Sequence, residues 1–137
     1  MTCKGMNRKI VEKFPELQAR YIDETSWQEG DETGSHVVFG GVFTPYFEQN
    51  LRGRNFEKLA VIFAFIEEIL ARKDVESENV IALSVISGNE SDLVNAEILP
   101  LLGVQTKKLL LEMMTADMPS TVVKKKWVQA LEESLGG

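Results

Sequence analysis

The residues best suited to chemistry are an acidic segment and the only histidine, which follows it closely. Between residues 23 and 32 the chain has five carboxylates and no basic side chain. The residues of this candidate partner-binding site are Asp23, Glu24, Trp27, Glu29, Asp31, Glu32 and His36. Carboxylates and an imidazole can together bind a divalent metal ion. A metal-dependent hydrolase or a small-ligand sensor that uses the acidic segment and His36 is therefore an alternative function.

The spacing of these residues does not favour a metal site. An EF-hand loop needs acids at alternate positions, followed by a glycine and a distal glutamate, and the segment lacks this pattern. One histidine and one cysteine cannot supply the ligands of a structural zinc site. We therefore expect no structural metal and no cofactor.

Nucleophilic catalysis has little support from the sequence. Cys3 lies close to the N-terminus, whereas cysteine–histidine chemistry needs a rigidly placed thiol. The chain has no Gly-x-Ser-x-Gly elbow, no P-loop and no dinucleotide-binding glycine pattern. These observations predict a protein that is not an enzyme. A single cysteine also excludes an intrachain disulfide, which fits a reducing compartment.

The chain as a whole is acidic, with a net charge of −6 and a pI of about 4.9. Because such a chain repels phosphate backbones, we expect no nucleic-acid partner, whereas a basic protein partner suits it. Lys124–Lys126 stand beside Trp127, as in some basic-aromatic nucleic-acid patches. Trp127 shares a helix face with Val123 and Leu131, however, so we expect its ring in the core.

The elements that must position these residues are helices, because apolar residues recur at three- and four-residue spacings along almost the whole chain. The predicted helices cover 7–25, 35–51, 55–72, 79–86, 89–102, 104–114 and 120–135. Prolines leave three alternatives open: a helix start or a kink at Pro15, a kink at Pro45 or a second short helix capped by Thr44, and a helix end or a kink at Pro100. This pattern predicts an all-α fold, a helical bundle or short α–α superhelix of about six to seven helices. We expect residues 1–137 to form one domain.

Three local predictions complete the helical interpretation. Ser35 and Asn89 are expected to cap the helices that follow them. The segment 79–86 is rich in β-branched residues, and its alternation also suits a strand. No second strand is available to pair with it, so we predict a buried helix.

The helix predicted over 55–72 carries two pairs of residues with an expected role. Ala60 and Ala64 are small, and we expect them to allow close packing on a neighbouring helix. Glu67 and Glu68 are adjacent and therefore point about 100° apart on a helix, so they cannot act together on one bond. We expect both carboxylates on a solvated face.

The composition fits a cytoplasmic protein. Hydrophobic residues make up 44% of the chain, which is enough for an ordinary core. The N-terminus lacks the apolar stretch of a signal peptide, and apolar runs such as 59–66 are too short to span a bilayer. We predict a cytoplasmic location without membrane insertion.

Several short segments, in this order, resemble an uncharacterised family of small bacterial all-α proteins. They are Phe14–Leu17, Gly34–Gly40, Phe43–Tyr46, Asn79–Val85 and Pro100–Gly103. The resemblance covers about Phe14 to Leu111. It implies an all-α fold and a bacterial source, and it carries no catalytic residues with it. By analogy with similar small helical proteins, it also implies an immunity protein, which neutralises a toxin by binding it.

Together these observations predict a non-catalytic protein-binding domain, with toxin neutralisation as its most specific form. If the acidic segment is the contact surface, a basic partner would meet it, with Trp27 as an aromatic anchor. The sequence does not give the oligomeric state.

Overall fold

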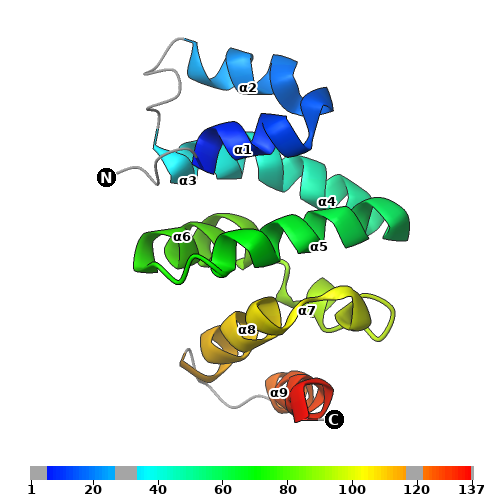
Figure 1. Ribbon diagram of the computed structural model, residues 1–137. Coiled ribbons are helices and arrows are strands. Elements are labelled where there is room, and N and C mark those ends of the chain that lie inside the picture. Colours follow the sequence, from blue (N-terminus) through cyan, green and yellow to red (C-terminus); the bar gives the residue numbers. More distant parts are fainter. Residues whose placement is uncertain (1–5, 27–33, 117–121, 137) are drawn as a thin grey trace.

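The computed structural model describes residues 6–26, 34–116 and 122–136, and within these ranges it consists of helices without a strand (Figure 1). The α-helices are α1 (Met6–Lys13), α2 (Gln18–Thr25), α3 (Ser35–Val38), α4 (Thr44–Arg52), α5 (Phe56–Leu70), α6 (Val75–Val80), α7 (Glu90–Leu93), α8 (Val104–Ala116) and α9 (Val122–Gly136). Short 3-10 helices, η1 (Pro15–Leu17) and η5 (Leu99–Leu101), and π-helices, η3 (Phe39–Phe43) and η4 (Ile81–Ile86), connect or extend them. The all-α prediction is confirmed.

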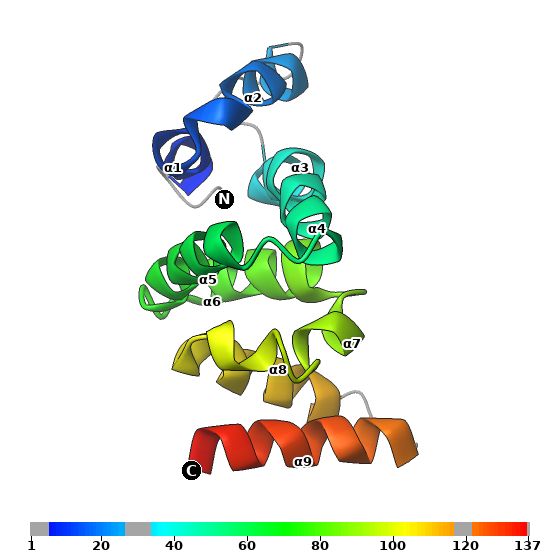
Figure 2. The ribbon, with the colours of Figure 1, turned by 90° about the vertical axis from the view of Figure 1, so that its right-hand side faces the viewer.

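The helices are stacked along the molecule in chain order. Figures 1 and 2 show α1 and α2 at one end and α9 at the other, with α5 and α6 side by side in the middle. In both views α5 lies between α1 and α8. This stacked arrangement is of the kind expected for a bundle or short α–α superhelix.

An aromatic cluster holds the first half of this stack together. The Phe14 ring meets the Phe65 ring edge-on, with centroids 5.5 Å apart, and Phe43 lies 5.4 Å from the same ring. Phe14 follows α1, Phe43 ends η3 and Phe65 belongs to α5, and all three are at most 1% exposed. Each buried ring removes a large apolar area from water, so the cluster fixes α1 against α5.

The segment predicted as a buried helix over 79–86 is helical, with π-helical geometry over Ile81–Ile86, although Leu83 is 65% exposed. It packs against the other π-helix, η3, which runs without a break into α4. A π-helix widens the hydrogen-bond ladder locally. Here the Thr44 hydroxyl donates a 2.5 Å hydrogen bond to the Ser84 carbonyl oxygen and so ties the two segments.

One cap prediction was wrong, and the other holds for position only. Gly34, not Ser35, occupies the N-cap position of α3, and the buried Ser35 hydroxyl has no hydrogen-bond partner among the described residues. Asn89 does occupy the N-cap position of α7, but its side-chain nitrogen donates to Glu48 and to the Val85 carbonyl, and its side chain makes no capping hydrogen bond. The helix predicted over 89–102 is also replaced by the four-residue α7, turns and η5, because Pro100 cannot donate within a helix.

The remaining helix predictions agree with the structure. The first predicted helix breaks before Pro15, as expected, and α5, α8 and α9 lie close to their predicted ranges. Leu131 on α9 is buried, whereas the Trp127 side chain lies outside the described residues. In the part of the chain that is described, no helix combines the length and the apolar character needed to cross a membrane.

Candidate functional site

The structure describes three of the seven residues in the predicted partner-binding site. Asp23 is exposed on α2, and the Glu24 carboxylate lies against Gly41, where an added Cβ would be 3.1 Å from Oε2. His36 is exposed in the first turn of α3. The other four, Trp27, Glu29, Asp31 and Glu32, lie outside the described residues.

His36 contacts a residue that sequence reasoning did not connect with it. Its Nδ1 atom lies 2.8 Å from the Ser84 hydroxyl, across the junction between α3 and η4. Nucleophilic catalysis by a serine needs a base that is itself oriented by a third group. Among the described residues, the other ring nitrogen of His36 has no hydrogen-bond partner. The contact therefore acts as a structural link between the two segments.

Metal-binding side chains do not gather within the described ranges. There, no three His, Cys, Asp or Glu side chains come close enough to hold one ion.

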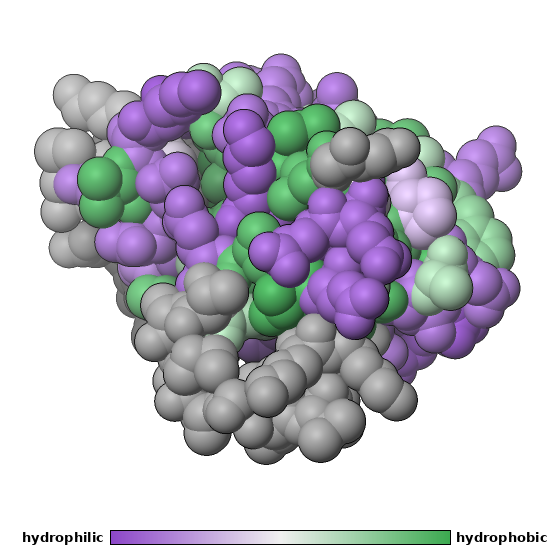
Figure 3. All heavy atoms as spheres, turned by 90° about the horizontal axis from the view of Figure 1, so that it is seen from below, coloured by the Kyte–Doolittle hydropathy of each residue, from purple (hydrophilic) through white to green (hydrophobic). Residues whose placement is uncertain are grey.

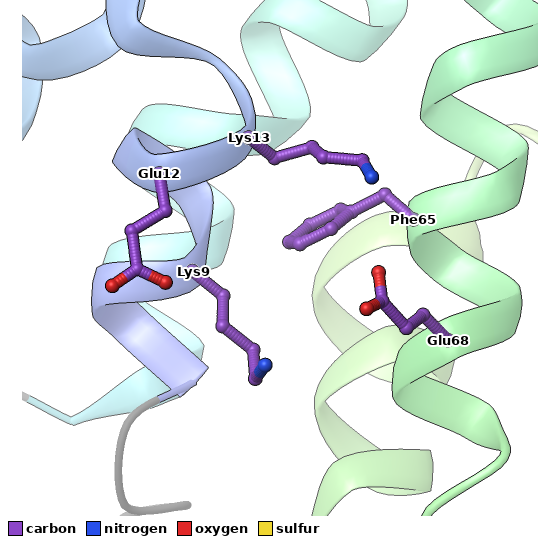
Figure 4. Close-up of a pocket in the computed structure, with 5 residues that line it drawn as sticks. All are labelled: Lys9, Glu12, Lys13, Phe65 and Glu68. Atoms are coloured by element: carbon purple, nitrogen blue, oxygen red, sulfur yellow. The ribbon is translucent and has the colours of Figure 1, made fainter.

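A groove with charged walls lies between α1 and α5. It consists of two adjoining pockets of about 130 Å³ and about 220 Å³, which share Lys9 and Glu68. Lys9 and Lys13 reach from α1 toward α5, whereas Phe65 and Glu68 point from α5 toward α1 (Figure 4). Glu12 also lines the first pocket, but Figure 4 shows its carboxylate on the side of α1 away from Phe65. Ile69 and Arg72 complete the second pocket.

The charged groups in this groove are largely unpaired. Neither Lys9 nor Lys13 forms a salt bridge within the described residues, and the same holds for Glu68. Arg72 has an acidic neighbour, since its Nε atom is 3.7 Å from an Asp74 carboxylate oxygen. Charged groups that the fold leaves without partners around a concave surface are available to a ligand. The only sequence signal for this groove is the pair of lysines one helical turn apart on α1.

The outer face of α5 next to this groove is uncovered, and its exposed apolar side chains share it with the exposed Glu57 and Glu68. Phe56 is 39% exposed and Val61 is 41% exposed. Ala60 and Ala64 are also exposed, so the prediction that they pack on a neighbouring helix of the chain was wrong. Helices α1 and α8 flank α5 on its two sides, and neither covers this face (Figure 1). The face that lies at the bottom of Figure 1 differs, because hydrophobic and hydrophilic residues are intermixed on it (Figure 3).

The two carboxylates on α5 have different surroundings, which corrects the prediction of a shared solvated face. Glu67 is half-buried and accepts hydrogen bonds from the Gln105 and Thr106 backbone N–H groups, at 3.1 and 2.7 Å. The Thr106 hydroxyl donates a third, at 2.7 Å. Glu67 therefore caps α8 from another helix. Gly103 stands where α8 begins, and a Cβ there would lie 2.1 Å from the Glu67 side chain.

A polar network on the surface fixes η1 against α4 and α5. Glu16 accepts hydrogen bonds from the Tyr46 hydroxyl and from the Lys58 ammonium, the latter at 3.2 Å. The hydrogen bond from Tyr46, above all, lowers the pKa of Glu16. Burial, followed by the same hydrogen bond, raises the pKa of Tyr46. The hydrogen bond to Glu16 raises the pKa of Lys58. The network thereby ties η1, which follows α1, to α4 and to the first turn of α5.

The chain belongs to the family described as Domain of unknown function (DUF7674), whose sequence profile matches residues 7–115. The matched region contains α2 through α7 and nearly all of α1 and α8, and therefore both walls of the groove. It also spans the residues on which the resemblance to an uncharacterised family rested, so that part of the prediction is confirmed. Neither the curated proteins nor the solved structures include a match to the chain.

Proposed function

We propose that this chain is a non-catalytic protein-binding domain and that the outer face of α5 is its main contact surface. The observation that carries the proposal is the uncovered face of α5, on which Phe56, Ala60, Val61 and Ala64 are exposed beside Glu57 and Glu68. Exposed apolar patches with a polar rim are typical of protein interaction sites. The rim here is the charged groove between α1 and α5.

The residue sizes on α5 suit a partner element that approaches closely. Ala60 and Ala64 lie one turn apart, so their small side chains leave the helix backbone accessible to a neighbour. Pairs of membrane-spanning helices that approach each other closely use small residues at this spacing. Their exposure costs the free protein little, but their burial by a partner would add apolar contact area.

The acidic segment and His36 support a second contact in the same proposal. Asp23 and His36 are exposed, and a basic surface of the partner would meet them together with Trp27. The net charge of −6 favours such a partner at long range. In its most specific form, the proposed function is toxin neutralisation in a bacterial cytoplasm.

The general proposal is tested by blocking the α5 face. In Ala64→Arg, a long charged side chain would occupy the surface without entering the core, so the variant should fold like the parent. We expect it to lose partners that co-purify with the tagged parent protein from cells of the source organism. Glu78→Arg, at an exposed position of α6, is the matched control and should retain them. Equal recovery of every partner by both variants would contradict the role of the α5 face.

The specific form needs its own experiment, in which candidate toxins encoded beside the gene are expressed with and without this chain. Rescue of growth that depends on direct binding would support toxin neutralisation. If no neighbouring gene product is toxic, the specific form is wrong while protein binding remains open to the first test.

A small-ligand sensor is a second candidate, favoured by the two adjoining pockets between α1 and α5. Their volumes suit a small charged molecule rather than a large cofactor. A library of small carboxylates and amino acids can be screened by protein NMR. Saturable shifts confined to Lys9, Lys13 and Glu68 would favour the sensor over the protein-binding domain.

A further inference from the structure

We infer that the groove between α1 and α5 binds a free amino acid with an apolar side chain, in its zwitterionic form. The inference rests on the small-ligand sensor, the second candidate function, because it names the ligand class of the same groove. It does not depend on the protein contact proposed for the outer face of α5. Its supports are the balance of charge in the pocket lining, the separation of the opposite charges, and the size and apolar part of the pockets.

The lining of the first pocket has no net charge. Its charged residues are two lysines, Lys9 and Lys13, and two glutamates, Glu12 and Glu68. A small anion would meet repulsion from Glu68, and a small cation would meet repulsion from the lysines. A ligand that is neutral overall but carries one charge of each sign is attracted by both walls. The balance of charge therefore favours a zwitterion over a simple carboxylate or a simple amine.

The opposite charges stand on opposite walls of the groove. Lys9 and Lys13 extend from α1, and the Glu68 carboxylate extends toward them from α5 (Figure 4). Within the described part of the chain, none of these three groups forms a salt bridge. The fold thus places opposite charges around one pocket without letting them neutralise one another. A ligand carboxylate can accept hydrogen bonds from the lysine ammonium groups while the ligand ammonium donates to Glu68.

The second pocket offers space for an apolar side chain. Lys9 and Glu68 line both pockets, so the two charged groups of the ligand belong where the pockets adjoin. The other residues of the second pocket are Ile69, which is 1% exposed, and Arg72. The Arg72 guanidinium already has Asp74 as its partner, at 3.7 Å, so its aliphatic stem is what remains for a ligand. An apolar side chain suits this lining better than a charged one.

The pocket volumes match a ligand with few atoms. Pockets for drug-sized ligands measure about 300–1,000 Å³. The two pockets here measure about 130 Å³ and about 220 Å³. Phe65 lines the first pocket and is 1% exposed, so it closes the groove beside the charged groups. A single amino acid has the size and the charges that this groove accepts.

The experiment uses the full chain and four free amino acids, namely leucine, valine, methionine and phenylalanine. Each is tested beside two analogues that lack only the ammonium or only the carboxylate group. For leucine these analogues are 4-methylpentanoate and 3-methylbutylamine, which keep the apolar part unchanged. Isothermal titration calorimetry measures the affinities, and protein NMR locates the binding site by shifts of assigned signals.

The expected result is saturable binding of at least one of these amino acids, with the largest shifts at Lys9, Lys13 and Glu68. Each analogue with a single charge should bind at least about tenfold more weakly than its parent amino acid. The reason is that the analogue loses one ion pair and still faces the wall of like charge.

Two variants should change the charge preference in opposite directions. Glu68→Gln should weaken amino acid binding about tenfold but strengthen binding of the analogue that has only a carboxylate, since a repulsion is removed. Lys9→Gln should also weaken amino acid binding, but it should strengthen binding of the amine analogue. Glu57→Gln is the matched control, because Glu57 is exposed on α5 and lines neither pocket. It should leave all three affinities unchanged, and circular dichroism establishes that each variant folds.

The contrary outcomes separate this inference from the sensor itself. An analogue that binds as tightly as its parent amino acid excludes recognition of a zwitterion. Shifts away from the groove, or equal weakening of all three ligands by Glu68→Gln, exclude the arrangement argued from Lys9 and Glu68. If no amino acid binds but a small carboxylate of the wider screen does, the inference is wrong and the sensor stands. If nothing in the screen binds, the sensor fails as well, whereas Ala64→Arg tests protein binding separately.

Discussion

The two neighbouring carboxylates of α5 show how differently the two sides of one helix are used. Glu67 faces α8, where three hydrogen bonds from Gln105 and Thr106 surround its oxygens. Glu68 faces α1 and enters a groove whose described residues give it no salt bridge. A glutamate is therefore held by hydrogen bonds within the fold at position 67 and is available to a ligand at position 68.

The difference lies in what the opposite helix presents. The first N–H groups of any α-helix lack an intrahelical acceptor, and Gly103 has no side chain with which to supply one for α8. Glu67 supplies it from α5, and its negative charge also suits the positive end of the α8 dipole. On the other side, α1 presents the side chains of Lys9 and Lys13 to α5. One interface is therefore satisfied within the chain, and the other is open to a ligand.

The largest effect is expected for Glu67→Ala. Removing the carboxylate leaves the Thr106 N–H and hydroxyl without their acceptor, although Thr106 is fully buried. A buried donor left unsatisfied costs about 1–3 kcal/mol, so the free energy of unfolding should fall by about 2–3 kcal/mol. Urea denaturation followed by circular dichroism measures it. A loss below about 0.5 kcal/mol would show that water replaces Glu67 and that the comparison with Glu68 is wrong.

Gly103→Ala should have the next largest effect, because its new Cβ would overlap the Glu67 side chain at 2.1 Å. Displacing the capping carboxylate should lower the free energy of unfolding by about 1–2 kcal/mol. The matched control is the double variant with Glu67→Ala, in which the space is vacant. There Gly103→Ala should cost much less, and the difference between the two backgrounds measures the contact in a double-mutant cycle. If Gly103→Ala lowers the free energy of unfolding equally in both backgrounds, the strain does not come from overlap with the Glu67 side chain.

A cap within one segment gives a smaller effect that depends on pH. Asp74 caps α6, and the hydrogen bond from the Ser77 N–H, above all, lowers the pKa of its carboxyl group. A carboxyl group whose pKa is lowered in the folded state stabilises the protein at pH values above its pKa in the unfolded chain, about 3.9. This stabilisation is lost as the pH falls through the pKa of the folded state. Asp74→Asn keeps a capping acceptor but removes the titration. Its stability should therefore fall less steeply than that of the parent below about pH 4 in acid titrations followed by circular dichroism. Parallel acid curves for the two proteins would contradict this role of Asp74.

Much of the fold follows from the sequence because helix formation is mainly local. The period of apolar residues located α5, α8 and α9 closely, and the lack of a partner strand correctly decided the helical state of 79–86. The caps were harder to predict. Ser35 has the right residue type for an N-cap, but Gly34 takes that position, and the cap of α8 comes from a residue 39 positions away in the sequence.

The candidate site was less accessible to sequence reasoning for the same reason. The groove joins Lys9 and Lys13 to Phe65 and Glu68, and the packing of Phe14, which follows α1, on the Phe65 ring brings them together. Spacing along one helix could indicate that Lys9 and Lys13 are neighbours, but not that the fold leaves them unpaired. The acidic segment was evident from composition, and four residues of its predicted site lie outside the described structure.

The smallest effect on stability is expected for Glu68→Gln, and it is the sharpest test of the comparison. Glu68 has no salt bridge to lose, and an exposed residue of this kind usually changes stability by less than about 0.5 kcal/mol. Replacing its charge with an amide removes one of two acids from the groove lining, so the groove becomes more positive. Glu67→Gln should behave in the opposite way, with a marked loss of stability. If calorimetry shows Glu68→Gln and Glu67→Gln to be equally destabilising, Glu68 is as much a part of the fold as Glu67, and its carboxylate is not available to a ligand.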